Sequence, residues 1–455
     1  MNLPQQDVIA AIATPPGKGG VGIIRVTGSD LSPILAAITN TDVQARHAHL
    51  LDFLDQDGST IDTGIALFFP APNSYTGEDT LELQGHGSPV VLGMLLRRLT
   101  SLGVRLANPG EFTQRAFLNN KIDLAQAEAI ADLIDSSTEQ AARSAQKSMQ
   151  GLFSKHIHLL ITQLIDLRQY VEASIDFSEE AIDFLSDGAV AEKLNTVRSQ
   201  LHTILQSAQQ GCLLRDGMNV VIIGPPNVGK STLLNALSGE DMAIVSEIVG
   251  TTRDTLRTQI QIDGMPLHII DTAGLRQATD SIEQEGIRRA YQEIANADLL
   301  LMLNDGQNDL MADDTIENNR LALSIPDSIP VCRIHTKIDQ LNQPAALNTD
   351  HQETHISLSA KSGEGLDLLR NYLKQSMGYQ AETDDIFIAR RRHTKALEEA
   401  LAAIETGQQY LSEKQAIELL AEELRIAQNT LNEITGEFTN EDLLGEIFSS
   451  FCIGK

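Results

Sequence analysis

The residues whose types and spacing point most directly to chemistry lie between Val220 and Ser231, in the stretch VVIIGPPNVGKS. An apolar, β-forming run leads into Gly224, and the segment then fits the pattern G-x-x-x-x-G-K-[ST]. Such a loop points backbone N–H groups at phosphate oxygens, and the following helix adds the positive end of its dipole. Lys230 is expected to reach the β- and γ-phosphates, and the Ser231 hydroxyl to ligate Mg²⁺. A chance glycine turn is the alternative.

Two further segments suit the same nucleotide. DTAG, from Asp271 to Gly274, follows the apolar run Leu267–Ile270. An aspartate there can hold the water shell of Mg²⁺, and the Gly274 N–H can bind the γ-phosphate. An ordinary aspartate turn is the alternative. GTTRD, from Gly250 to Asp254, is expected to close on the nucleotide with Thr252 as a second Mg²⁺ ligand, unless it is a plain polar loop.

The base is expected to be guanine. The segment TKID, residues 336–339, follows the apolar run Val331–Ile334. Its Asp339 carboxylate can accept hydrogen bonds from guanine N1–H and N2–H₂, a pattern that adenine cannot offer. SAK, residues 359–361, supplies small residues that pack against a base. A charged loop is the alternative for the first segment, but the order of these pieces at strand ends predicts a GTPase.

Two residues depart from the common GTPase pattern. Thr336 stands where asparagine is usual, so the position keeps a hydroxyl but not an amide, and a weaker nucleotide affinity is expected. Leu275 stands where Ras-like enzymes place the glutamine that orients the attacking water. Since leucine cannot hydrogen-bond water, the catalytic machinery is expected to differ.

Composition narrows the class of protein. The 455 residues include 62 acidic and 34 basic ones, for a net charge of −28, which argues against non-specific binding to DNA, RNA or membranes. A local basic patch or a partner protein remains a route to RNA contact. The three cysteines, Cys212, Cys332 and Cys452, show no metal or disulfide spacing. With no signal peptide and no membrane-length apolar run, a cytoplasmic protein is expected.

The chain is expected to be a multidomain α/β protein. Residues 1–119 show short apolar runs between glycine and proline turns, typical of an α+β domain. Residues 120–217 and 379–455 carry helical periodicity, and residues 218–378 alternate strand and helix. The economical interpretation is one helical domain built from two chain segments, into which a Ras-like α/β P-loop domain is inserted.

Apolar patterns predict individual elements. Strands are expected at residues 21–26, 65–69, 81–83, 220–223, 267–270, 299–303, 331–334 and 356–358, and a helix at 92–102. Long amphipathic helices are expected around 160–171 and 190–204, and a helical seam runs from Ile417 to Ile434. Gly436 is expected to end that helix, and Thr439 with Asp442 to open a short final one.

The motifs resemble those of a known family. The order GPPNVGKS, GTTRD, DTAGLR, TKID and SAK is similar to that of the TrmE-Era-EngA-like, translation-factor-related GTPases. The stretches TPPGKGGVGIIRVTG, SYTGEDTLELQGHG, NPGEFTQRAFLNNKIDLAQAEAI and the terminal FCIGK narrow the resemblance to the MnmE (TrmE) family of tRNA-modification GTPases. The resemblance covers the whole chain.

This resemblance implies a GTPase whose domains dimerise across the nucleotide and use K⁺ in place of an arginine finger. Glu283 would position the attacking water, although a solvated helix charge is the alternative. The implied K⁺ ligands are Asn227, Ser246, Ile248 and Thr251, and the implied Mg²⁺ ligands are Ser231 and Thr252. The implied GTP-binding residues are Asn227, Val228, Gly229, Lys230, Ser231, Thr232, Ser246, Glu247, Ile248, Val249, Gly250, Thr251, Thr252, Asp271, Thr272, Ala273, Gly274, Thr336, Lys337, Asp339, Ser359, Ala360 and Lys361.

A second implied site binds a tetrahydrofolate derivative, either 5,10-methylene- or 5-formyl-tetrahydrofolate, in an N-terminal domain that also dimerises. The matching positions are Arg25, Glu82, Lys121 and Lys455; without the family, each would be an ordinary surface charge. Cys452 matches the functional cysteine of the family, and Lys455 would favour its thiolate. The alternatives for Cys452 are a buried apolar cysteine or a lipidated one, for which the end CIGK is poorly suited.

The family implies a homodimer that joins MnmG, which carries FAD and uses NADH, in a heterotetramer. Together they would modify C5 of the wobble uridine in certain tRNAs, with a folate one-carbon unit and either glycine or ammonia as amine donor. GTP hydrolysis to GDP would gate this chemistry. The rival hypotheses are a GTP-dependent ribosome or RNA assembly switch without modification chemistry, and a nucleotide-binding scaffold. An assembly factor would usually carry an RNA-binding module, which the sequence does not show.

Overall fold

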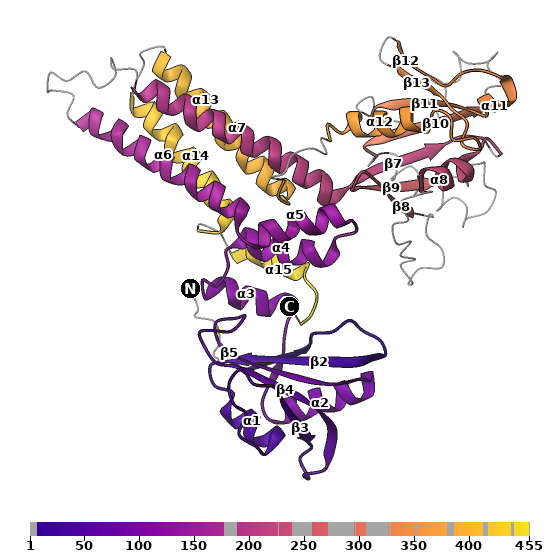
Figure 1. Cartoon of the computed structure of the whole chain (residues 1–455). Coiled ribbons are helices and arrows are strands. Elements are labelled where there is room, and N and C mark those ends of the chain that lie inside the picture. Colours follow the sequence, from indigo (N-terminus) through magenta and orange to yellow (C-terminus); the bar gives the residue numbers. More distant parts are fainter. Residues whose placement is uncertain are drawn as a thin grey trace. The chain divides into compact units, whose positions relative to one another are not determined.

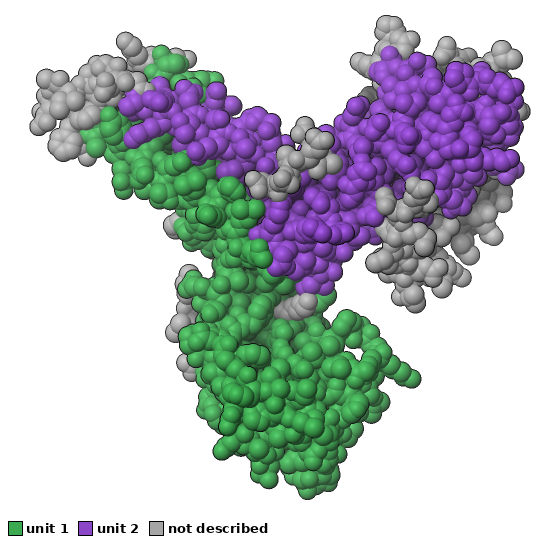
Figure 2. Space-filling view, viewed as in Figure 1, with its two compact units in different colours: residues 1–131, 149–187, 406–455 green, residues 132–148, 188–405 purple. Residues whose placement is uncertain are grey.

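A computed structural model describes residues 7–176, 189–225, 227–238, 257–271, 295, 297–305, 326, 329–350, 353–379, 386–412, 417–437 and 441–454. The chain divides into two compact units (Figure 2). Unit 1 comprises Met1–Ala131, Met149–Asp187 and Thr406–Lys455, and unit 2 comprises Asp132–Ser148 and Gly188–Glu405. The predicted domain boundaries at 119, 217 and 378 divide the chain differently, so they stay a prediction.

Unit 1 contains a six-stranded sheet in the order β3-β4-β5-β2-β1-β6, in which β1 pairs with β6 in parallel and the other pairs are antiparallel. Alternate residues of the strands face α1 and α2 across an apolar core that includes Ile24, Leu83 and Leu95. The elements (Figure 1) are β1 (Ile9–Ile12), β2 (Gly19–Gly28), α1 (Ser32–Thr39), β3 (His49–Leu54), β4 (Thr60–Phe69), β5 (Asp79–Gly87), α2 (Pro89–Ser101), β6 (Arg105–Leu106) and α3 (Glu111–Leu118).

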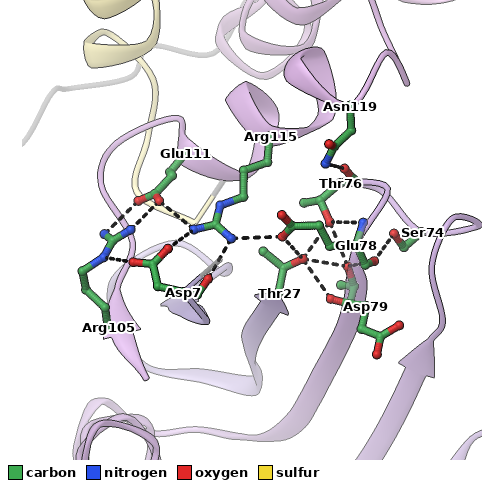
Figure 3. A network of polar contacts seen from close by, with 11 residues as sticks. Asp7, Thr27, Ser74, Thr76, Glu78, Asp79, Arg105, Glu111, Arg115 and Asn119 are labelled. Carbon is green, nitrogen blue, oxygen red and sulfur yellow. Dashed lines mark hydrogen bonds and ion pairs between the residues drawn. The ribbon is translucent and has the colours of Figure 1, made fainter. Parts of the chain in front are cut away.

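A buried polar network ties α3 to this sheet (Figure 3). The Arg115 guanidinium, whose side chain is 5% exposed, donates to Asp7 Oδ1 at 2.8 Å, Glu78 Oε2 at 3.0 Å and Glu111 Oε1 at 3.1 Å. Arg105 adds hydrogen bonds to Asp7 at 2.7 Å and to Glu111 Oε1 at 2.6 Å. Charges buried to this extent persist only when they are paired and hydrogen-bonded, as they are here.

This network should make the stability of unit 1 sensitive to acid. Burial would raise the pKa of Glu111, but hydrogen bonds from Arg105, the Asn108 N–H and Arg115 outweigh burial and lower that pKa below 4.5. A lowered pKa stabilises the fold above the unfolded-state pKa, and the gain is lost as pH falls through the folded-state pKa. The thermal midpoint should therefore fall between about pH 5 and pH 3 in the native chain, and with a shallower slope in Glu111→Gln.

Glu422→Gln is the matched control for this prediction, because Glu422 pairs with Arg425 on an exposed face of unit 1, at 2.6 Å. Exposed pairs contribute little to stability, so the control should keep the native slope. Identical slopes for native chain and Glu111→Gln in scanning calorimetry would show that the network does not carry the acid sensitivity.

The rest of unit 1 is helical and ends beside the N-terminal sheet. Helix α6 (Leu152–Asp176) packs along α14 (Ile417–Thr435), where Arg168 Nη1 donates to Gln428 Oε1 at 2.7 Å. The first part of α4 (Leu124–Asp135) packs with α15 (Glu441–Ser449) through Leu124, Ile447 and Phe448. The C-terminal tail then reaches β1: a side chain at Gly454, where φ is +100°, would lie 2.3 Å from the Ile12 carbonyl oxygen.

Unit 2 contains a seven-stranded sheet in the order β12-β13-β11-β10-β7-β9-β8, in which β9, β7, β10, β11 and β13 run parallel. Both faces of the sheet bury apolar side chains, one against α8 and α12. The elements are β7 (Met218–Ile223), α8 (Lys230–Ser238), β8 (Arg257–Ile262), β9 (Met265–Asp271), β10 (Leu299–Asp305), β11 (Val331–Thr336), α11 (Ile338–Leu341), β12 (Ala346–Asp350), β13 (Glu353–Ser357) and α12 (Leu366–Ser376).

The other helices described in unit 2 include most of α5 (Glu139–Met149), α7 (Ala189–Asp216) and the first part of α13 (Arg391–Ser412). The chain enters the sheet after α7 and leaves it before α13. The Asp132 carboxylate is hydrogen-bonded to residues at both of these points. Asp132 Oδ1 accepts hydrogen bonds from Arg215 Nε at 2.8 Å and Arg390 Nη2 at 2.9 Å, with the Asp132 side chain 4% exposed. This closeness of entry and exit is typical of a domain inserted into another.

Most predicted elements are confirmed, with longer bounds than the apolar runs alone gave. The strand expected at 356–358 instead spans Glu353–Ser357; its polar first residues pair with β12 and were not part of an apolar run. The helix expected at 92–102 spans Pro89–Ser101. The seam of α14 is buried from Leu420 to Ile434, and Gly436, at φ +89°, follows the end of that helix. Thr439 lies outside the described residues, and α15 begins at Glu441. Within the described helices, none has the length and apolar character needed to cross a membrane.

Candidate functional site: a phosphate loop with a guanine-type pocket, and a charged pair on the N-terminal sheet

The phosphate loop connects β7 to α8 at the carboxyl end of the parallel sheet. Gly224 is needed because a side chain there would lie 2.8 Å from the Leu303 carbonyl oxygen of β10. Asn227 and Gly229 adopt positive φ angles of 62° and 104°, conformations that asparagine and glycine tolerate best. Lys230 begins α8, and its Nζ donates to the Gly224 carbonyl oxygen at 2.8 Å, so the ammonium lies across the loop.

A pocket opens between this loop and the ends of β11 and β13. Asp339 Oδ1 accepts a hydrogen bond of 2.7 Å from the Ser359 hydroxyl, which holds the exposed carboxylate in place. Lys337, at φ 63°, pairs with Asp305 at 2.8 Å at the end of β10. A carboxylate held in this way presents acceptors for two adjacent N–H donors. The pocket is lined by Val228, Gly229, Thr232, Thr336, Lys337, Asp339, Gln340, Ser359, Ala360 and Lys361.

Thr336 links the base-binding segment to the phosphate loop. Its side chain is buried, and its hydroxyl donates to the Val228 carbonyl oxygen at 2.7 Å and approaches the Asn304 carbonyl oxygen at 3.2 Å. Threonine therefore keeps a side-chain bridge between β11 and the loop that cradles phosphate. The sequence suggested only that a hydroxyl was retained; the structure gives that hydroxyl its acceptors.

Thr336→Val should weaken guanine-nucleotide binding about tenfold, because valine has nearly the same shape but removes this donor; a buried unsatisfied acceptor costs about 1–3 kcal/mol. Thr336→Ser keeps the hydroxyl and is the matched control. Titration of a fluorescent GDP analogue measures both. Equal affinities for the valine variant and the native chain would show that the bridge does not support the loop.

Several predicted nucleotide and metal ligands lie outside the described residues. Asp271 is the last residue of β9, paired in register with Ile222 of β7, which places its backbone beside the start of the phosphate loop. Ser231 lies in the first turn of α8 and Asn227 in the preceding loop, which is the segment predicted to hold phosphate. The predicted residues outside the description are Ser246, Glu247, Ile248, Val249, Gly250, Thr251, Thr252, Thr272, Ala273, Gly274, Leu275 and Glu283.

On the N-terminal sheet, the structure brings Arg25 and Glu82 together as cross-strand partners of β2 and β5. Glu82 Oε1 accepts hydrogen bonds from Arg25 Nη2 at 2.9 Å and Nε at 3.1 Å, and Oε2 accepts one from Gln84 Nε2 at 3.1 Å. The side chains are 22% and 16% exposed, so the pair is shielded yet reachable. Such a pair offers both cationic donors and a carboxylate acceptor to a ligand that has both kinds of polar edge.

Two more predicted residues, Lys121 and Cys452, lie among the described residues. Lys121 follows α3, and its Nζ donates to the Pro72 carbonyl oxygen at 2.9 Å, on the loop that joins β4 to β5. Cys452 is exposed, which rules out the buried-cysteine alternative. Its carbonyl oxygen accepts a long hydrogen bond, 3.5 Å, from the Gly110 N–H that precedes α3. Lys455 lies outside the described residues.

Sequence reasoning missed the aromatic residues around Arg25. Tyr75 and Phe112 place their rings 5.4 Å and 6.0 Å from the Arg25 guanidinium carbon. Tyr75 belongs to SYTGEDTLELQGHG and Phe112 to NPGEFTQRAF, so both stretches were singled out, but no spacing rule connects residues so far apart in the chain. Gln340, which lines the guanine-type pocket, was missed because a single polar residue on a short helix forms no recognisable sequence pattern.

The parallel sheet, the phosphate loop and the aspartate pocket define this chain as a P-loop GTPase that carries additional α+β and helical parts. Comparison with known proteins supports this class. Residues 8–121 match the family model of the GTP-binding protein TrmE N-terminus, and residues 124–452 match that of the MnmE helical domain. The chain belongs to the MnmE family of tRNA modification GTPases.

Relatives of this family match along their whole length. The tRNA modification GTPase MnmE of Methylococcus capsulatus is 57% identical over 455 residues, with all of both chains covered. That of Vibrio cholerae is 56% identical over 450 residues, covering 99% of each chain. Among solved structures, Era of Aquifex aeolicus is 26% identical over 41% of this chain and 66% of its own, with a TM-score of 0.27. The G domain of the T. maritima FeoB iron transporter is 21% identical over 35% of this chain and 98% of its own, with a TM-score of 0.26.

Proposed function

We propose that this chain hydrolyses GTP and, with MnmG as partner, modifies C5 of the wobble uridine of certain tRNAs in the cytoplasm. The observation that carries the proposal is the full-length match to MnmE proteins, together with a pocket in which Asp339 and the phosphate loop suit a guanine nucleotide. A reduced folate would supply the one-carbon unit, and FAD and NADH would act on the partner. The domain boundaries at 119, 217 and 378 are part of this proposal.

The geometry of the phosphate loop supports its part in GTP hydrolysis. Lys230 already lies across the loop, and a small rotation of its side chain would exchange the Gly224 carbonyl for a phosphate oxygen. Ser231 is exposed in the first turn of α8, directly after the phosphate loop, which suits its assignment as a Mg²⁺ ligand. When bound, Mg²⁺ neutralises charge that develops on the phosphates. We assign the second Mg²⁺ ligand to Thr252 and the positioning of the attacking water to Glu283.

We further propose that K⁺ stimulates hydrolysis. Asn227 supports this role because it is exposed in the phosphate loop, where it adopts a positive φ angle. Ser246, Ile248 and Thr251 would complete the set of oxygens, and two GTPase domains of a homodimer would close over the nucleotides. A cation beside the β- and γ-phosphates supplies the charge stabilisation that an arginine finger gives elsewhere.

The GTPase rate of the purified chain in K⁺ and in Na⁺ tests this function. The rate with GTP should be at least about tenfold higher in K⁺ than in Na⁺, since one charge contact in a transition state is worth that much or more. ATP should be a poor substrate in both salts. Asn227→Ala should lose the preference for K⁺ but keep nucleotide binding. Equal rates in both salts would refute the role of K⁺, and hydrolysis of ATP at the GTP rate would refute the assignment of the pocket.

The Arg25–Glu82 pair supports the assignment of folate to the N-terminal sheet. A reduced folate combines a pterin with N–H donors and carbonyl groups and a negatively charged glutamate tail. Glu82 suits the pterin N–H edge, while Arg25, Lys121 and Lys455 suit anionic or carbonyl oxygens. Cys452, on the exposed tail beside α3, is the residue that we assign to the modification chemistry.

A further inference from the structure

Two aromatic rings lie close to the Arg25 guanidinium. Its guanidinium carbon is 5.4 Å from the ring centre of Tyr75 and 6.0 Å from that of Phe112, within the range of cation–π attraction. This attraction strengthens when the cation has lost water, and the Arg25 side chain is only 22% exposed. Both hydrogen bonds from Nε and Nη2 go to Glu82 Oε1. In the described part of the chain, Nη1 makes no hydrogen bond and is available to a ligand.

Tyr75 is itself held at both ends of its side chain. Its hydroxyl shares a 2.8 Å hydrogen bond with the Thr113 hydroxyl, and Thr113 is fully buried in α3. The ring packs on the small apolar cluster of Ile9, Ala11 and Phe112. Burial raises the pKa of Tyr75, and the Thr113 hydrogen bond and the Arg25 charge only partly oppose this effect, so the phenol stays neutral. The ring therefore has little freedom to turn away from Arg25.

The loop that carries Tyr75 joins β4 to β5 and is pinned along its length (Figure 3). The Thr76 hydroxyl lies 2.7 Å from that of Thr27, and the Thr76 carbonyl accepts from Asn119 Nδ2 at 2.8 Å. Glu78 pairs with Arg115 at 3.0 Å. Surface loops are ordinarily mobile, so this density of buried hydrogen bonds marks the loop as a support. This loop carries Tyr75, whose ring centre is 5.4 Å from the Arg25 guanidinium carbon.

The first turn of α3 connects the same support to the C-terminal tail. Phe112 is the second residue of α3, and the Gly110 N–H just before the helix donates to the Cys452 carbonyl oxygen at 3.5 Å. Gly110 has φ +67°, and a side chain there would lie 2.6 Å from the Phe448 carbonyl oxygen. The first turn of α3 thus carries Phe112, whose ring lies beside Arg25. Gly110, just before that turn, is hydrogen-bonded to the backbone of Cys452.

We infer that Tyr75 and Phe112 are positioning residues of the proposed folate site. They hold the plane of the Arg25 guanidinium against Glu82, so that Nη1 faces outward to an anionic or carbonyl oxygen of a reduced folate. This inference rests on the proposed function, because it takes folate as the ligand of Arg25. It assigns no contact with the ligand to either aromatic residue; both act through Arg25.

Binding of 5-formyltetrahydrofolate to the full-length chain, measured by isothermal titration calorimetry, tests the inference. Tyr75→Leu removes the ring and should weaken binding about tenfold, the scale of one partly desolvated cation–π contact. Tyr75→Phe keeps the ring and should bind within about threefold of the native chain. Phe53→Leu, in the apolar core of the same sheet, is the control for a loss of stability without loss of the site. Tyr75→Leu that binds as tightly as the native chain would overturn the inference.

A double-mutant cycle separates this inference from the proposed site. Arg25→Gln should weaken binding on its own, and adding Tyr75→Leu should then cost little more, because the cation on which the ring acts is gone. An undiminished cost in the Arg25→Gln background would mean that Tyr75 contacts the ligand directly, which contradicts a positioning role. If Arg25→Gln binds as tightly as the native chain, the assignment of folate to Arg25 fails, and the inference fails with it.

Discussion

Asp339→Asn should reduce the affinity for GTP by about 100- to 1,000-fold and raise the affinity for xanthosine triphosphate. The carboxylate offers acceptors to guanine N1–H and N2–H₂, and two hydrogen bonds to a charged group contribute about 1.5–3 kcal/mol each. An asparagine amide keeps one acceptor oxygen but places its N–H₂ group against the other donor, so only part of this energy is lost. Xanthine carries a carbonyl in place of the 2-amino group, so the same amide can donate to it.

Competition between the two nucleotides for a fluorescent GDP analogue measures this change. Ser359→Ala is the matched control: it removes the 2.7 Å hydrogen bond that holds Asp339 Oδ1 but leaves the charge, so a smaller loss without a change of base preference is expected. If Asp339→Asn keeps its preference for GTP, the pocket between β11 and β13 does not recognise the base.

Cys452→Ser should abolish tRNA modification and leave GTP hydrolysis near its native rate. The thiol is exposed on the tail of unit 1, whereas the phosphate loop belongs to unit 2. A hydroxyl has nearly the same size as a thiol but is a much weaker nucleophile at neutral pH, so the fold should persist while any step that uses the thiolate stops. Reconstitution with MnmG, tRNA and a folate, with GTP hydrolysis followed in parallel, measures both activities.

The other two cysteines provide controls. Cys332 is buried in β11, and burial raises its pKa to about 12, as burial does for Cys212 in α7. Such thiols are inert, so Cys212→Ser and Cys332→Ala should retain modification in proportion to their folded fraction. Loss of GTP hydrolysis together with modification in Cys452→Ser would show that the cysteine serves the fold or the GTPase cycle instead.

The parallel sheet was predictable from sequence because each buried strand is a continuous apolar run and each nucleotide motif follows one. Lys230, Asp339 and Ser359 therefore follow the strands that their motifs were predicted to follow. β8 and β12 were missed, since antiparallel edge strands with polar residues, such as those from Ala346 to Asp350, carry no strong periodicity. The polar first half of β13 was missed as well.

The N-terminal site could be predicted only by resemblance. Arg25 and Glu82 face each other because β2 and β5, which are far apart in sequence, are neighbours in an antiparallel sheet. The pairing register of such distant strands cannot be predicted from local residue patterns. The support of Arg25 by Tyr75 and Phe112 depends on loop and helix packing, for which sequence spacing gives no rule. The same holds for the tail, where Gly454 lies against Ile12 of β1 and α15 packs on α4.

Mass spectrometry of wobble nucleosides in tRNA from cells that lack this protein tests the proposed function most directly. The modified C5 group of the wobble uridine should disappear, return with the native gene, and fail to return with Cys452→Ser or Arg25→Gln. Wobble uridines that stay fully modified without the protein would refute the proposed function and leave a GTP-dependent assembly switch as the better description.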